Sequence, residues 1–165
     1  MRAGVLLAVL LLVACAGASP SPAPEPVRIL ATDLGLIAEP FSVAVIDNDT
    51  DYLTGWAQTD RSSAPPEVDW TSEVVVYLGM AGSSSCPETF QHLVVDLEAA
   101  HVYGDWRPVD IALGMGCTDD LQGQGLVLAV NRSVLPVGQF TLTLREALMC
   151  PDCPDHPDQA IVDLS

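Results

Sequence analysis

Short runs of alternating hydrophobic and polar residues, separated by turn-forming residues, fill most of the chain after residue 40. Residues 41–47 (FSVAVID) alternate and are β-branched, which is typical of a half-buried strand. Residues 72–79 (SEVVVYLG) are apolar almost throughout, which indicates a buried central strand. Further strands are predicted at 90–98, 109–115, 125–131 and 139–146, with weaker candidates at 52–58 and 100–106.

The segments between these runs are rich in Asp, Asn, Ser, Gly and Pro, the residues that turns require. Helical periodicity is almost absent, and only residues 31–40 are ambiguous between a helical turn and a strand. The pattern predicts an all-β domain over residues 28–148. A small antiparallel β-sandwich with an immunoglobulin-like arrangement is the first expectation, and a small β-barrel is the alternative.

The N-terminus carries an apolar run that ends at a cysteine. Residues 5–14 follow Arg2 and are too few to cross a bilayer, which needs about 20 apolar residues, but they have signal-peptide proportions. The four residues LVAC (12–15) resemble the lipobox of bacterial lipoproteins. The resemblance implies that residues 1–14 are a signal peptide and that the Cys15 thiol receives a diacylglycerol. The alternative is a conventional signal peptide with an unrelated cysteine.

The residues after Cys15 cannot form a core. Residues 16–26 (AGASPSPAPEP) contain four prolines and no large apolar side chain. Such a segment is expected to be extended, and residues 15–27 are therefore interpreted as a tether. Two or three acyl chains anchor a protein stably, so the expected location is the extracytoplasmic face of the cell membrane.

The charge of the chain is strongly acidic. Asp and Glu number 22, against six arginines and no lysine, which gives a formal net charge of −16. Such a surface repels phosphate backbones, so nucleic acid is not an expected partner.

Four cysteines remain after Cys15, and an even number outside the cytoplasm favours disulfides. Cys86 and Cys117 both follow apolar runs, whereas Cys150 and Cys153 lie together near the C-terminus. Four cysteines allow three pairings. Pairing within each group is the most economical, and it predicts the bridges Cys86–Cys117 and Cys150–Cys153.

The C-terminal residues 149–165 are interpreted as an acidic, Cys- and Pro-rich tail. Within it Cys150, Cys153 and His156 offer soft and borderline ligands for zinc or copper. A structural zinc site normally needs four protein ligands, and a redox Cys-x-x-Cys motif normally opens a helix after a strand. A local disulfide is therefore preferred to a metal site or a redox motif, and no cofactor is predicted.

Aspartates at alternate positions in residues 47–51 (DNDTD) resemble the start of an EF-hand loop. Tyr52 stands where that loop needs glycine, and Gln58 stands where it needs glutamate. A turn between strands is therefore preferred to a calcium site.

No catalytic set can be assembled from the remaining candidates. His92 and His101 are expected to be structural or surface imidazoles, and the serines at 83–85 lack the glycines of a nucleophile elbow. The three tryptophans, Trp56, Trp70 and Trp106, suit either a ligand platform or ordinary packing, and packing is preferred.

Two hypotheses for function follow. The first is a non-enzymatic, membrane-anchored binding or scaffold module of the bacterial cell envelope, with an unidentified envelope protein or ligand as its partner. The second is an envelope metal-binding or redox accessory protein that uses Cys150, Cys153 and His156. Oxidised cysteines without metal would favour the first hypothesis, and free thiols with stoichiometric metal would favour the second.

Overall fold

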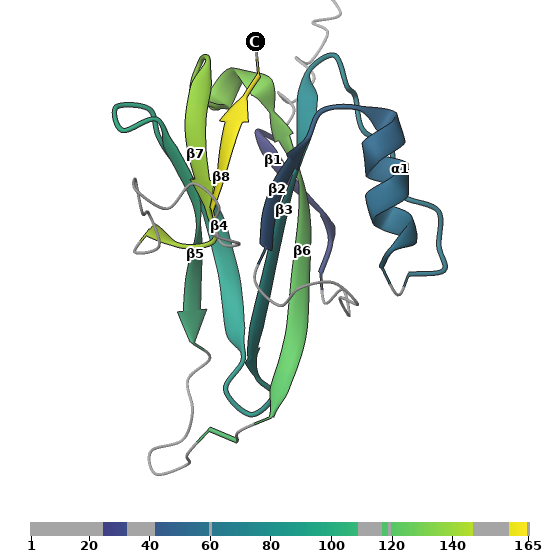
Figure 1. Cartoon of the computed structure of the whole chain (residues 1–165), viewed down its shortest axis with the longest axis vertical. Coiled ribbons are helices and arrows are strands. Elements are labelled where there is room, and N and C mark those ends of the chain that lie inside the picture. Colours follow the sequence, from purple (N-terminus) through teal and green to yellow (C-terminus); the bar gives the residue numbers. More distant parts are fainter. Residues whose placement is uncertain are drawn as a thin grey trace, which may run out of the picture.

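The computed structural model describes residues 25–32, 42–59, 61–108, 117–118, 120–146 and 159–164. Its strands form two four-stranded sheets packed face to face (Figure 1). The first sheet has the order β1-β6-β3-β2 and the second the order β4-β5-β7-β8. The bounds are β1 Val27–Ala31, β2 Ser42–Ile46, β3 Glu73–Ser83, β4 Glu88–Asp96, β5 His101–Pro108, β6 Leu121–Asn131, β7 Gln139–Thr143 and β8 Gln159–Asp163. The small all-β sandwich predicted from the sequence is confirmed, and the described strands do not close into a barrel.

The first sheet is antiparallel throughout and is built around the long β3–β6 pair, in register from Glu73↔Asn131 to Ser83↔Leu121. Alternate residues of these strands face the second sheet and form the main core. The intervening residues, such as Val75 and Val127, are also buried, because the helix α1 (Asp49–Ala57) covers the outer face. Strand β3 is therefore apolar on both faces, which explains its unbroken hydrophobic run.

The second sheet contains one parallel pair. Strands β4 and β5 pair antiparallel, as do β7 and β8, but β5 and β7 run parallel. Val102, Phe140 and Leu142 are among its residues that close the core against the first sheet. Gly138, at a φ of +82°, occupies the left-handed region directly before β7, where glycine is favoured.

The strand predicted at residues 52–58 is wrong, because residues 52–57 belong to α1 and Gln58 is its C-cap. Asn48 caps this helix: its side-chain oxygen accepts a hydrogen bond from the Asp51 amide at 2.9 Å. Asp49 and Asp51 add negative charge in the first turn, which the helix dipole favours. The turn between strands expected at 47–51 is likewise wrong, since its polar residues begin this helix.

Two further strands were not predicted. Strand β1 begins at Val27, directly after the proline-rich segment, and pairs with β6. Strand β8 falls within the expected tail 149–165, but its residues pair with β7, and Val162 is buried in the core. The interpretation of residues 159–163 as tail is therefore corrected. The strand predicted at 109–115 lies outside the described residues.

Cys86 and Cys117 form a disulfide, as predicted, with their Cα atoms 5.5 Å apart. The bridge lies at the end of the sandwich where β3 turns into β4 (Figure 1). Cys86 follows β3 and Cys117 precedes β6, so the antiparallel pairing of these strands brings the two sulfurs together. The opposite end holds the start of β1 and the end of β6, where the Asn131 amide donates to the Pro26 carbonyl at 2.8 Å.

Candidate functional site

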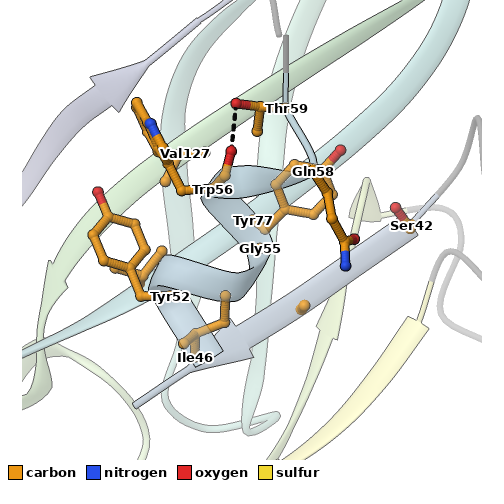
Figure 2. Close-up of a pocket in the computed structure, with 11 residues that line it drawn as sticks. Ser42, Ile46, Tyr52, Gly55, Trp56, Gln58, Thr59, Tyr77 and Val127 are labelled. Carbon is orange, nitrogen blue, oxygen red and sulfur yellow. Dashed lines mark hydrogen bonds between the residues drawn. The ribbon is translucent and has the colours of Figure 1, made fainter. Parts of the chain in front are cut away.

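A pocket of about 240 Å³ lies between α1 and the outer face of the first sheet (Figure 2). Ile46 and Tyr52 lie at one end of this α1 pocket, and Ser42, Tyr77 and Gln58 lie at the other. Its walls come from one face of β2, from the outward side chains of β3 and β6, and from the inner side of the helix with its C-terminal turn. The remaining lining residues are Ala44, Gly55, Trp56, Thr59, Val75 and Val127.

The space exists because large residues support the helix and small residues lie between them. Tyr52 and Trp56, four positions apart, are the two buried side chains of α1. Ala44 and Gly55 offer little or no side chain to the volume between helix and sheet. A Cβ added at Gly55 would reach only ordinary contact with Ile46, at 3.8 Å.

The segment 61–70 ties the helix in place from its other side. The Tyr52 hydroxyl donates to the Pro66 carbonyl at 3.2 Å, and the Trp56 indole nitrogen donates to the Ser63 carbonyl at 2.9 Å. Trp70 packs edge-on against Tyr52, with ring centroids 5.6 Å apart. Tyr52 and Trp56, the aromatic residues that α1 contributes to the pocket, are therefore held in fixed positions.

In the described part of the chain, the Tyr77 hydroxyl is the one buried polar side-chain atom that lacks a hydrogen bond. No partner with normal geometry reaches its hydroxyl among the described residues. Burial raises the pKa of Tyr77 to about 12, and the nearby Ser42 hydroxyl lowers it only in part. The Ser42 interaction is thus weak, and the Tyr77 hydroxyl keeps its proton at neutral pH and is free to donate it.

The described lining of the pocket contains no charged side chain. Tyr52 is also protonated at neutral pH, since burial raises its pKa to about 12. A charged ligand that moved from water into this site would lose its hydration and would find no opposite charge to replace it. The arrangement therefore suits an uncharged, largely apolar ligand.

The three tryptophans do not form a shared platform. Trp56 and Trp70 both belong to the cluster around α1. Trp106 lies in β5, packs against Phe90 with ring centroids 5.3 Å apart, and donates to the Leu144 carbonyl at 3.0 Å. Packing is therefore the observed role of Trp106, while Trp56 both packs and lines the pocket.

The two described histidines have different surroundings. His101 is buried, and its Nε2 lies 2.7 Å from the Thr143 hydroxyl, which itself donates to the Arg145 carbonyl. Because that hydroxyl proton is already used, His101 Nε2 is the donor, and burial lowers the pKa of His101. His92 is exposed, with its Nδ1 at 3.6 Å from an Asp105 oxygen.

The serines at 83–85 lie beside the disulfide and bind Thr118 and Asp120. Ser83 and Ser85 each lie about 3 Å from the Thr118 hydroxyl. Ser84 and Thr118 donate to Asp120, and these hydrogen bonds lower the pKa of its carboxyl group. The hydrogen bonds of these serines reach Thr118 and Asp120 and no histidine of the described residues, so the cluster connects the turn after β3 to the start of β6.

Metal candidates find no support among the described residues, where no group of three or more His, Cys, Asp and Glu side chains could hold a metal ion. The residues of the calcium candidate lie at the start of α1 instead. Cys15, Cys150, Cys153 and His156 lie outside the described residues. No helix in the described part is long and apolar enough to cross a membrane.

Sequence reasoning missed the α1 pocket because it missed the helix. The signals were present: an Asn cap at position 48, followed by aromatic residues at the helical spacing of Tyr52 and Trp56. Comparison of the chain with protein-family models, curated proteins and solved structures finds no match.

Proposed function

We propose that the protein is a lipid-anchored, non-enzymatic binding module on the extracytoplasmic face of a bacterial cell membrane, with the α1 pocket as its binding site. The observation that carries this proposal is the pocket itself. It is apolar, it lies between a helix and a sheet, and one of its lining residues, Tyr77, carries a buried hydroxyl without a hydrogen bond. Sites of this composition are typical of small-molecule binding.

The anchor rests on the LVAC sequence, whose cysteine is Cys15. The first strand begins at Val27, so residues 16–26 separate the proposed lipid from the folded domain. An extended segment of this length reaches roughly 34 Å, at about 3.1 Å per residue. The domain would therefore stand clear of the lipid head groups while remaining attached to the membrane.

The anchor is tested with labelled fatty acid in a bacterial host. The natural chain should take up label and partition into detergent, and Cys15→Ser should lose both properties. Equal labelling of Cys15→Ser and the natural chain would contradict lipid attachment.

The binding site is tested with xenon and benzene, which enter apolar cavities without needing polar contacts. NMR shifts should change at Val75, Tyr77 and Val127 when either probe is added. Ala44→Phe should abolish these changes by filling the pocket, while the melting temperature stays the same or rises. Ile161→Phe, on the exposed surface of β8, is the matched control and should bind both probes normally. If neither probe affects these residues, the pocket is not a binding site.

A further inference from the structure

We propose that the ligand of the α1 pocket is a small, uncharged molecule with a flat apolar body and one hydrogen-bond acceptor, which the Tyr77 hydroxyl binds. This inference rests on the proposed function, because it names the class of ligand for the same site.

The size of the ligand follows from the volume of the pocket. At about 240 Å³ the pocket is smaller than most sites for drug-sized molecules, which span about 300 to 1,000 Å³. A cavity of about 150 Å³ is already sufficient for benzene. The α1 pocket therefore has room for one ring and a short substituent, on the order of ten non-hydrogen atoms.

The shape and polarity of the body follow from the walls. Three aromatic side chains line the pocket, together with Val75, Val127 and the methyl group of Ala44. Aromatic walls pack well against flat apolar groups, in offset or edge-to-face arrangements. The Trp56 and Tyr52 polar atoms are already bound to backbone carbonyls, so they present apolar surfaces to a ligand.

That the ligand is uncharged follows from the residues that line the pocket and from the net charge of the protein. No charged side chain is present in the described lining, so an ion would be buried without a partner. The net charge of −16 further disfavours anions.

The acceptor follows from the Tyr77 hydroxyl. A buried hydroxyl without a partner loses its hydrogen bond to water on folding and is costly to leave unpaired. Because its pKa is about 12, it stays protonated and offers a donor rather than a negative charge. The hydroxyl oxygen has almost no exposed surface, so binding requires a neighbouring side chain to move before a ligand reaches it. Ser42 and the exposed Gln58 line the same end of the pocket.

Three molecules of nearly equal size and shape test this inference. Acetophenone carries a carbonyl acceptor, cumene replaces that carbonyl with a methyl-bearing carbon, and benzoate replaces the methyl group with a second oxygen and a negative charge. Each is titrated into the folded protein, and binding is followed by the NMR shifts of Val75 and Val127. Because the carbonyl costs more to take out of water than the alkyl group of cumene, the measure is the ratio of the two affinities. We expect this ratio to favour acetophenone about tenfold more in the natural chain than in a chain without the Tyr77 hydroxyl, the effect of one well-formed hydrogen bond to a buried donor. Benzoate should not bind measurably.

Variants then assign the preference to one atom. In Tyr77→Phe the ratio of the acetophenone affinity to the cumene affinity should fall about tenfold, because only the hydroxyl is removed. Tyr103→Phe, which removes a hydroxyl from β5, is the matched control and should keep the ratio of the natural chain.

The outcomes separate the two proposals. An affinity ratio that is the same in the natural chain and in Tyr77→Phe would overturn the acceptor and the role of this hydroxyl, while the binding site stands. Tight binding of benzoate would overturn the exclusion of charge. Failure of all three molecules, together with xenon and benzene, would remove the proposed binding site itself.

Discussion

Removing the Cys86–Cys117 bridge should destabilise the domain through the unfolded chain rather than through lost packing. The bridge joins the turn after β3 to the segment before β6, across a sequence separation of 31. Cys86 is half-buried and Cys117 is exposed, so the double substitution Cys86→Ala with Cys117→Ala leaves no cavity in the core. What it removes is a restraint on a long loop of the unfolded protein.

The magnitude follows from the length of that loop. For a closed loop of about 32 residues the chain-entropy relation gives roughly 3.7 kcal/mol at 25 °C. A domain of this size has a net stability of about 5 to 15 kcal/mol, so the loss is a large share of it. Each kcal/mol lowers the melting temperature by about 3 to 4 °C in this size range, which gives a fall of roughly 10 to 15 °C.

Circular dichroism during heating, together with urea unfolding, measures this effect. The hydrogen bonds that join Ser83 and Ser85 to Thr118 do not involve the sulfurs, so the fold should persist without the bridge. The control is Cys150→Ala with Cys153→Ala, for which a short loop sets a ceiling of about 2 kcal/mol. A fall of less than about 3 °C on loss of Cys86–Cys117 would refute the entropic reasoning. Free thiols at Cys86 and Cys117 in the non-reduced protein would refute the bridge.

Gly104→Ala should destabilise the domain by about 2 to 4 kcal/mol, through overpacking and a lost hydrogen bond. The added Cβ would lie 2.4 Å from the Trp106 Nε1, which forces the indole away from the Leu144 carbonyl. Gly82→Ala, which meets nothing within 4 Å, is the control, and equal melting temperatures for the two variants would disprove the role of this close contact. His101 makes stability depend on pH, because burial lowers its pKa in the folded state below the ordinary value of 6.5. As the pH falls, the unfolded chain therefore binds this proton before the folded chain does. The contribution of His101 to the free energy of unfolding is complete above pH 6.5 and is lost below it, by at most about 1.4 kcal/mol per pH unit. In His101→Gln the urea midpoint should change less between pH 7 and 5.5 than it does in the natural chain. An unchanged dependence of the midpoint on pH would show that His101 is not the responsible group.

Local patterns were sufficient to predict most of the first sheet. Alternation in residues 41–47 predicted β2, because it indicates a strand with one buried face. The unbroken apolar run of residues 72–79 predicted the central strand β3, because it indicates a strand with both faces buried. The bridge between Cys86 and Cys117 was predicted correctly but for a different reason. The expectation relied on a strand at 109–115, whereas the observed pairing follows from the antiparallel neighbours β3 and β6.

The candidate site depended on contacts that no local pattern specifies. The residues from Tyr52 to Trp56 mix apolar and polar side chains in a way that a strand and a short helix both allow. The Asn48 cap and the burial of both aromatic residues against the first sheet decide in favour of the helix.

Long-range pairing decided the rest of the fold. Residues 159–163 form a strand because β7 offers them an edge, and β5 and β7 run parallel because the chain enters both from the same end of the sandwich. The sequence by itself determined which segments are apolar and on how many faces. Only the tertiary structure decided which segments meet, and so only it created the α1 pocket and left the Tyr77 hydroxyl without a partner. The physical reason is that a cavity and an unpaired donor are properties of residues brought together from distant parts of the chain.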